Sequence, residues 1–464
     1  MRNWGVRKAI RNAEFENICN IKGKTGVILI ELCIDPGMGE LLTECAHLRS
    51  AAVLYIDPGT GSMLFAILIG IIGALNYALR IAWVKLRFFF SGRKDKLADG
   101  EVIPFAIFSD HKRYWPVFEP VCREFDRRGI DVVYLTASPD DPALSAPYSH
   151  LKAEFIGEGN RAFVKLNFFK AVILLATTPG LDVYQWKRSP EVQYYVHILH
   201  AAGEVLLYRM FGLDYYDAVL LAGKFQVEDI RALEKLRDLP AKELVITGIP
   251  YMDEMVQRLK VAGPVPEHET TVLLAPSWGP SSIFNKFGGQ VIDALLKTGY
   301  HVIVRPHPQS FTSEKALMDE LMAKYPSGAG LEWNRDVDNF DVLRRADILI
   351  SDFSGVTFDF ALVYDKPIIY TDTEFDTAPY DAWWLDQQLW IDTALPRLGM
   401  KLTADKLASI KEMIDICLTS QQFANGRQEV REECWDCYGE GAGKTVDYLE
   451  SKYHELIAVK EEEK

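Results

Sequence analysis

The sequence predicts an α/β protein in which two domains, each built on a parallel sheet, face a cleft and follow one transmembrane helix. Three observations predict this architecture. The 464 residues are too many for one ordinary domain. Short runs rich in valine and isoleucine alternate with helical segments, which is typical of parallel sheets with crossover connections. One segment near the N-terminus carries no charge over the length of a membrane span.

The transmembrane helix is expected at Ser62 to Leu79, an 18-residue segment without a charged side chain that residues 81–84 extend past Arg80. At about 1.5 Å per residue it can cross a hydrocarbon core of about 30 Å. Basic residues gather after it, whereas Arg49 is the one lysine or arginine between residues 27 and 61. We therefore expect a single pass of a bacterial inner membrane, with the rest of the chain in the cytoplasm. A buried core helix and a cleavable signal peptide are the alternatives.

The first domain is expected to begin with a strand at residues 102–108, which ends in the helix-capping pair Ser109 and Asp110. An amphipathic helix follows at residues 114–128, and Gly129 ends it. Further strands are expected at residues 130–135, 170–176, 194–198, 218–222 and 244–247.

A polar, proline-rich stretch at residues 261–269 indicates a linker, after which the strand and helix pattern restarts. Ligands of open parallel sheets bind at the carboxyl ends of the strands, so the site is expected in the cleft between the domains. Strands are expected at residues 272–275, 301–305, 348–351 and 367–370, and helices at 291–298, 311–324, 356–363 and 443–453. The expected divisions are an N-terminal segment of uncertain role (1–54), the transmembrane helix with its basic stretch (55–98), an acceptor-side domain (99–262), a donor domain (263–455) and a disordered tail (456–464).

Composition excludes some classes of function. The formal net charge of −14 gives no overall attraction for nucleic acid. The seven cysteines form no disulfide framework, which fits a reducing compartment. Cys434 and Cys437 form a single CxxC, and a zinc site would need a second pair, so we expect an incidental or structural role for them.

The most informative segment is residues 347–360, DILISDFSGVTFDF. A hydrophobic strand ends in Ser351 and Asp352, and the small residues Ser354 and Gly355 then open a helix. Free backbone N–H groups at such a turn suit a phosphate, and the serine hydroxyls can add hydrogen bonds. An ordinary strand–turn–helix, with Ser354 as the N-cap, is the alternative.

Two other segments carry candidate chemistry at predicted strand ends. In VRPHP, residues 304–308, Arg305 and His307 face one side of an extended strand and suit a diphosphate group. In HILHAAG, residues 197–203, a histidine is the natural general base near neutral pH. His197 and His200 are three residues apart and point different ways, so one of them fits a packed core histidine. Purely structural roles remain open for all four side chains.

Together these segments resemble the CDP-glycerol glycerophosphotransferase family, the teichoic acid primases and polymerases. The segment from Leu343 to Asp372 is similar to the hallmark of that family. HAAG at His200, RPHP, LLAPSW (273–278) and GIPYMD (248–253) resemble its other motifs and occur in family order. Three positions depart from the pattern: Gly355 for a serine, and Gly279 and Tyr251 for arginines. These departures leave open another donor, such as CDP-ribitol.

The resemblance implies a GT-B-like fold with two Rossmann-type domains facing a cleft. It implies transfer of glycerol phosphate, or a related polyol phosphate, from CDP-glycerol to a hydroxyl of a lipid-linked glycan or teichoic-acid-like acceptor, with release of CMP. His200 and His307 are the catalytic candidates, and His200 would remove the proton from the acceptor. No metal site is convincing, although Asp372 and Glu374 keep a divalent metal open. The candidate donor-binding residues are Ser277, Arg305, Ser351, Asp352, Ser354, Gly355 and Asp359.

Three alternatives share these features. Other GT-B glycosyltransferases that use nucleotide sugars, and UDP-N-acetylglucosamine 2-epimerases, have the same scaffold, and fold alone does not separate them. An epimerase would need carboxylates beside the sugar ring and no membrane anchor. The third alternative is a catalytically silent membrane module.

Overall fold

The computed structural model describes residues 102–336, 338–371 and 376–462. The described residues all lie in one unit of the chain, Ala98–Lys464. The predicted transmembrane segment, residues 62–79, lies outside the described residues. Within the described part of the chain, no helix combines the length and apolar character of a membrane span.

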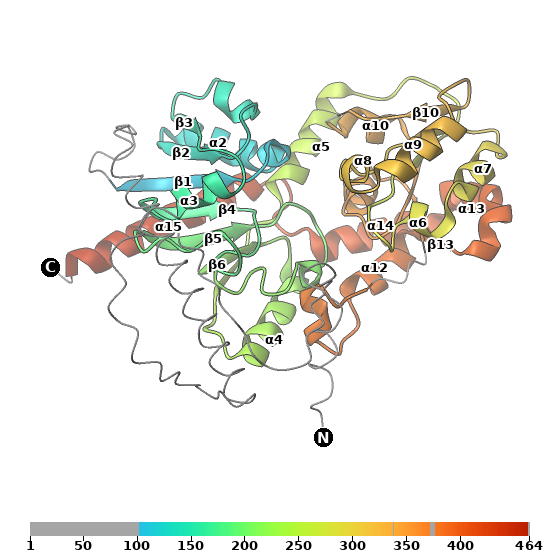
Figure 1. The fold of residues 1–464 in the computed structure, drawn as a ribbon. Helices are drawn as coiled ribbons and strands as arrows, with labels where there is room; N and C mark the ends of the chain where they lie inside the picture. Colours follow the sequence, from blue (N-terminus) through green and yellow to red (C-terminus); the bar gives the residue numbers. More distant parts are fainter. Residues whose placement is uncertain (1–101, 337, 372–375, 463–464) are drawn as a thin grey trace, which may run out of the picture. The chain divides into compact units, whose positions relative to one another are not determined.

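The first sheet has seven strands in the order β3-β2-β1-β4-β5-β6-β7 (Figure 1). Every neighbouring pair is parallel, which requires a crossover between successive strands. Apolar side chains cover both faces, because helices and loops pack on each side. The strands are β1 (Ile103–Ser109), β2 (Val132–Thr136), β3 (Leu151–Phe155), β4 (Ala171–Ala176), β5 (Val192–Ile198), β6 (Ala218–Leu221) and β7 (Glu243–Ile246).

The second sheet has six parallel strands in the order β10-β9-β8-β11-β12-β13. Its two faces are buried in separate apolar cores. A doubly covered parallel sheet in each half is the Rossmann-like architecture predicted from the sequence, and that fold class is confirmed. The strands are β8 (Thr271–Leu274), β9 (His301–Val304), β10 (Leu331–Trp333), β11 (Ile348–Ser351), β12 (Ile368–Thr371) and β13 (Gly399–Leu402).

The helices connect the strands and cover the sheets. In the first half they are η1 (Lys112–Tyr114), α2 (Trp115–Arg128), η2 (Pro142–Ser145), α3 (Asn160–Leu166), η3 (Val205–Leu207), η4 (Lys224–Gln226), α4 (Val227–Arg237) and α5 (Pro250–Ala262). In the second they are α6 (Ile283–Phe287), α7 (Gln290–Leu296), α8 (Ser310–Ser313), α9 (Lys315–Lys324), α10 (Phe340–Arg345), α11 (Val356–Phe358), η5 (Asp359–Val363), η6 (Asp381–Trp384), α12 (Trp390–Leu398), η7 (Ala404–Ser409), α13 (Ile410–Thr419), α14 (Gln421–Cys434) and α15 (Gly441–Glu462).

The last helix, α15, belongs to the core of the first sheet. Val446 and Leu449 are buried with side chains of β1 and α2, although the sequence assigned this helix to the donor domain. In Figure 1 the red helix lies along the blue and green strands. Its backbone stays helical to Glu462. The prediction of a disordered tail from residue 456 is therefore wrong for residues 456–462.

Every predicted strand is present with its ends within two residues of those expected. The pattern missed β3, β10 and β13, which lie at or near sheet edges. The predicted helix at 311–324 is two helices, α8 and α9. The helix predicted at 356–363 turns into a π-helix at Asp359.

Candidate functional site

A cavity of about 400 Å³ lies where loops from the carboxyl ends of β5 and β11 meet. Its lining includes His200 and Gly203 from the loop after β5, and Phe353, Gly355 and Phe358 from the turn after β11. These loops touch directly. A Cβ built on Gly355 would lie 3.5 Å from the Cβ of Ala201, and one built on Gly203 would lie 3.7 Å from the ring of Phe358. The HAAG motif and the Ser-Gly turn therefore share one site.

His200 is held through its Nδ1 atom. That nitrogen lies 3.2 Å from Thr177 Oγ1, at the end of β4, and 3.5 Å from the hydroxyl of Tyr208. The ring of Tyr114 packs edge-on against it at 5.3 Å. Burial, together with the positive charge of Arg113, lowers the pKa of His200 to about 4. The imidazole is therefore neutral near pH 7, which is the protonation state that a general base requires.

His197 takes the other role that the sequence left open. Its side chain is fully buried, with its ring packed edge-on against Tyr208 and Tyr216. Nε2 lies 3.2 Å from the Tyr208 hydroxyl, whereas Nδ1 has no hydrogen-bond partner among the described residues. Burial, together with the neighbouring His200, lowers the pKa of His197 to about 3. His197 does not line the cavity.

Two of the predicted donor-binding residues, Ser351 and Asp352, use their side chains in hydrogen bonds within the second domain. The Ser351 hydroxyl donates to the carbonyl oxygen of Ala275 at 2.7 Å. The Asp352 carboxylate accepts the backbone N–H of Ser277 at 3.0 Å and that of Ile283 at 3.1 Å. Asp352 is 2% exposed, and burial raises its pKa. Both side chains thus fix the loop after β8 against the turn after β11.

Ser354 and Gly355 stand at the open side of that turn. Ser354 is half-buried and Gly355 is exposed, in contrast to the buried Ser351 and Asp352. The N–H of Thr357 donates to the Ser354 carbonyl at 3.1 Å, and the N–H of Phe358 donates to the Gly355 carbonyl at 3.1 Å. The amides of Gly355 and Val356 precede these first helical hydrogen bonds. This is the geometry in which backbone N–H groups meet an anion.

Arg305 and His307 follow β9 as expected, and each has an internal partner. The Arg305 guanidinium donates to the side chain of Asn334 and, at 2.8 Å, to the carbonyl of Asp336. His307 Nδ1 accepts the backbone N–H of Gln309 at 3.1 Å. Burial lowers the pKa of His307 to about 4, so the ring is neutral near pH 7 and carries its proton on Nε2. His307 is thus a hydrogen-bond donor, whereas the Nδ1 contacts of His200 suit a base.

Asp359 is buried inside the second domain, at the start of η5. It is 6% exposed, and its Oδ1 has no hydrogen-bond partner among the described residues. Burial raises its pKa to about 7. Of the predicted site residues, only His200 and Gly355 line the cavity; the others do not, namely Ser277, Arg305, His307, Ser351, Asp352, Ser354 and Asp359.

Sequence reasoning missed four side chains around His200: Arg113, Tyr114, Thr177 and Tyr208. Arg113 is exposed, and its charge lowers the pKa of His200 in the first domain and of His307 in the second. Its guanidinium lies 5.0 Å from the centre of the Tyr114 ring. Arg113, Tyr114 and Thr177 follow strands β1 and β4, so the rule that ligands bind at carboxyl ends was the signal available for these three.

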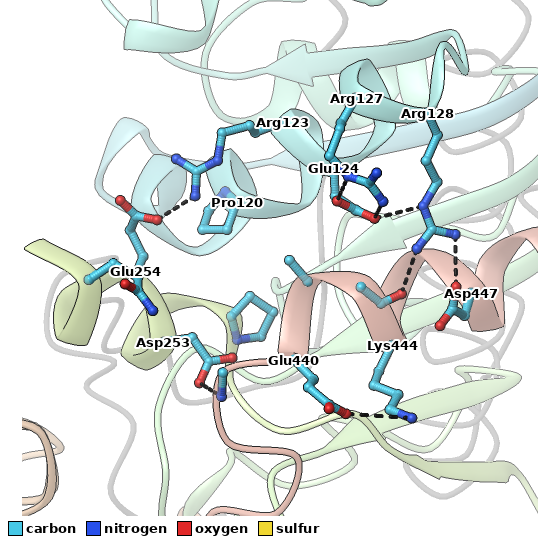
Figure 2. Close-up of a pocket in the computed structure, with 15 residues that line it drawn as sticks. Pro120, Arg123, Glu124, Arg127, Arg128, Asp253, Glu254, Glu440, Lys444 and Asp447 are labelled. Atoms are coloured by element: carbon cyan, nitrogen blue, oxygen red, sulfur yellow. Dashed lines mark hydrogen bonds and ion pairs between the residues drawn. The ribbon is translucent and has the colours of Figure 1, made fainter.

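Figure 2 shows a second pocket, of about 470 Å³, lined by α2, α5 and the start of α15. Its basic side chains all pair with carboxylates: Arg127 and Arg128 with Glu124, both at 2.7 Å, Arg123 with Glu254, and Lys444 with Glu440 at 3.6 Å. Among the residues that line this pocket, no basic side chain lacks a carboxylate partner and is left to bind a phosphate. We therefore do not assign the donor to this pocket.

The GIPYMD motif contributes Asp253 to that second pocket. Its carboxylate accepts the backbone N–H of Gly439 at 2.7 Å and of Gly441 at 2.8 Å. A Cβ at Gly441 would lie 2.7 Å from the Asp253 carboxylate, so the approach needs glycine. Asp253 thereby attaches the start of α15 to α5, which is a structural role.

The described residues hold no cluster of three or more histidine, cysteine or carboxylate side chains suited to a metal. Asp372 and Glu374, the residues that kept a metal open, lie outside the described residues.

Residues 216–382 match the family model described as CDP-Glycerol:Poly(glycerophosphate) glycerophosphotransferase. Over these residues the chain is similar to this family. The resemblance predicted from the sequence is confirmed over the segment that contains the Leu343 to Asp372 motif, whereas His200 precedes the matched residues.

Two curated relatives are each named teichoic acid glycerol-phosphate primase. The one from Bacillus spizizenii is 28% identical over 163 residues, and the one from Bacillus subtilis is 29% identical over 137 residues. The alignments cover 32% and 28% of this chain, and 39% and 33% of the relatives. The matched region thus spans less than half the length of either relative.

Two solved structures of the wall teichoic acid polymerase TagF share the fold. Their TM-scores are 0.50 and 0.52, at 16% and 14% identity. The superpositions cover 82% and 76% of this chain, and 99% and 89% of the other chains. This likeness confirms the GT-B-like arrangement of two Rossmann-like domains.

Proposed function

We propose that this chain transfers glycerol phosphate from CDP-glycerol to an acceptor hydroxyl and releases CMP. One observation carries the proposal: the HAAG histidine, His200, and Gly355 of the turn in the family segment line the same cavity. The site thereby combines a neutral histidine with backbone N–H groups suited to phosphate.

In the proposed reaction, the acceptor oxygen attacks the phosphorus that bears glycerol. The bond between that phosphorus and the oxygen bridging to CMP breaks, and CMP leaves with the electron pair. His200 Nε2 takes the proton of the acceptor hydroxyl. Phosphoryl transfer depends on positioning and charge stabilisation more than on covalent assistance. Arg113, the Nε2–H of His307 and the amides at Gly355 are the available groups of positive character.

Ser354 and Ser351 offer a matched test of donor binding. Ser354 is half-buried at the open side of the turn, whereas the Ser351 hydroxyl is bonded to Ala275. Ser354→Ala is expected to weaken CDP-glycerol binding about tenfold or more, as loss of a hydrogen bond to a charged group does. Ser351→Ala is expected to lower the melting temperature with little change in donor affinity. Calorimetry and thermal melting separate the two, and unchanged donor affinity in Ser354→Ala would place the phosphates elsewhere.

The acceptor and the membrane association belong to the same proposal. A hydroxyl on a lipid-linked glycan is the acceptor class, because the predicted segment at residues 62–79 would keep the site beside a membrane. Deleting residues 62–84 is expected to release the protein from membranes, and a reporter fused after Lys96 is expected on the cytoplasmic side. Sedimentation of the deletion variant with membranes in high salt would contradict a single anchor.

The decisive assay offers the full chain in detergent three donors, CDP-glycerol, CDP-ribitol and UDP-N-acetylglucosamine, with a lipid-linked glycan acceptor. CMP release that depends on the acceptor supports the proposal and identifies the polyol. Release of UDP instead would assign a glycosyltransferase. Turnover of UDP-N-acetylglucosamine without an acceptor would assign an epimerase or a hydrolase.

A further inference from the structure

The Nδ1 atom of His200 faces two hydroxyl groups that come from separate segments of the first domain. Thr177 Oγ1, at 3.2 Å, follows β4 and is fully buried. The Tyr208 hydroxyl, at 3.5 Å, follows η3 and lines the cavity. With Nδ1 directed at these oxygens, Nε2 is the ring nitrogen left for a substrate.

The Tyr208 hydroxyl has a second partner, His197. It lies 3.2 Å from His197 Nε2, which is nearer than its 3.5 Å contact with His200. A hydroxyl has one proton to donate. When that proton goes to the neutral His197, the Tyr208 oxygen can only accept, and the atom facing it on His200 is Nδ1. In that tautomer of His197, with its proton on Nδ1, His200 Nδ1–H donates to Tyr208 and Tyr208 donates to His197 Nε2.

The backbone of Tyr208 is held as well. Its carbonyl accepts the N–H of Asp381 at 2.9 Å, and the N–H of Met210 donates to the carbonyl of Pro379 at 3.1 Å. Asp381 is in turn paired with Arg237, and both side chains are buried. The position of the Tyr208 hydroxyl is therefore set from both halves of the structure.

We propose that Thr177 and Tyr208 are positioning residues that keep the proton of His200 on Nδ1, so that the Nε2 lone pair faces the acceptor hydroxyl. This inference rests on the proposed function. Without these two oxygens the neutral ring is free to carry its proton on Nε2, where it cannot act as a base. Once Nε2 has taken the acceptor proton, the same oxygens accept from Nδ1–H and stabilise the imidazolium in a dry site.

The chain offers a matched control for each residue. Thr178 is the next residue along the chain. It is also buried, and its hydroxyl makes no hydrogen bond to His200 among the described residues. Tyr216 is also buried and packs 4.9 Å from the His197 ring, but its hydroxyl donates to the Thr178 carbonyl at 2.5 Å. Thr177→Val and Tyr208→Phe are therefore compared with Thr178→Val and Tyr216→Phe.

The first measurement is the steady-state rate of CMP release. Thr177→Val and Tyr208→Phe are each expected to lower kcat about 3- to 10-fold, as removal of one hydrogen bond does, with the KM for CDP-glycerol unchanged. Thr177→Ser is expected to restore most of the rate, because it keeps the hydroxyl. Equal losses of kcat in the two control variants would show a packing effect and overturn the assignment.

The second measurement needs no substrate, so it separates failure of this inference from failure of the proposed function. Diethyl pyrocarbonate acylates an unprotonated imidazole nitrogen, and mass spectrometry locates the adduct. In the folded chain we expect His200 to react, and to react several-fold more slowly in Thr177→Val and Tyr208→Phe than in the controls. An unreactive wild-type His200, or equal rates in all four variants, would overturn the inference even where CMP release is observed.

Discussion

Replacing Asp359 by asparagine isolates the cost of a buried carboxylate. Burial raises the pKa of Asp359 from its ordinary value of 3.8 to about 7, and Oδ1 has no hydrogen-bond partner among the described residues. A shift of about 3 units at about 1.4 kcal/mol per unit amounts to about 4 kcal/mol. The folded state prefers the neutral acid, so this stability is fully present below the unfolded pKa of 3.8 and is lost as the pH rises towards about 7.

Asparagine has nearly the same shape and no proton to lose. The Asp359→Asn variant is therefore expected to gain stability relative to the wild type as the pH rises from 4 to 8, by up to about 4 kcal/mol. Urea unfolding of both proteins at several pH values measures this difference, and Asp341→Asn, an exposed aspartate of the same domain, is the control. Parallel stability curves for Asp359→Asn and the wild type would show that the carboxyl is ionised at little cost, and would refute the reasoning.

Three further predictions concern the site. Burial and Arg113 lower the pKa of His200 to about 4, so the acid limb of the kcat/KM profile is expected near pH 4. Arg113→Gln should move this limb to higher pH. A limb near pH 6.5 in the wild type would contradict the lowered pKa of a buried His200. His200→Ala should lower CMP release about 10²- to 10⁴-fold with donor affinity unchanged, whereas His197→Ala should mainly lower the melting temperature, and a reversed pattern would exchange their roles. Arg305→Ala should weaken donor binding by calorimetry about 10- to 150-fold if its guanidinium turns from Asn334 to the diphosphate, and no change would leave it structural.

The strands were predictable because a sheet covered on both faces needs continuous apolar runs. β4, with the sequence AVILLA, is buried along its whole length. β3, with the sequence LKAEF, has no fully buried side chain, since it lies at the edge of the first sheet. Its apolar and polar residues alternate over only five positions, so it lacks the continuous apolar run that marked the central strands. Helix α15 was assigned to the wrong sheet because an apolar stripe shows that a helix packs against a core, but does not show which core.

The site was predictable at the level of segments and less so at the level of side chains. Strand ends marked the loops that carry His200 and Gly355, since parallel strands end at one edge. The sequence could not distinguish Ser351 from Ser354. Ser351 is structural because its hydroxyl donates to the carbonyl of Ala275, which lies 76 positions away in the loop after β8. Thr177 and Tyr208 were missed because neither belongs to a motif, and their contacts with His200 depend on how the chain folds over 23 and 8 positions.

The return of α15 to the first sheet affects how the chain is made. A ribosome releases β1 through β7 long before residues 441–462, yet Val446 and Leu449 fill the core beside β1. Multidomain chains generally complete their N-terminal domain first during synthesis. Here the N-terminal domain stays incomplete until residues 441–462 emerge, and the apolar side chains that α15 covers stay exposed, while the second sheet already has all its strands. The half that emerges first is therefore the half that is completed last.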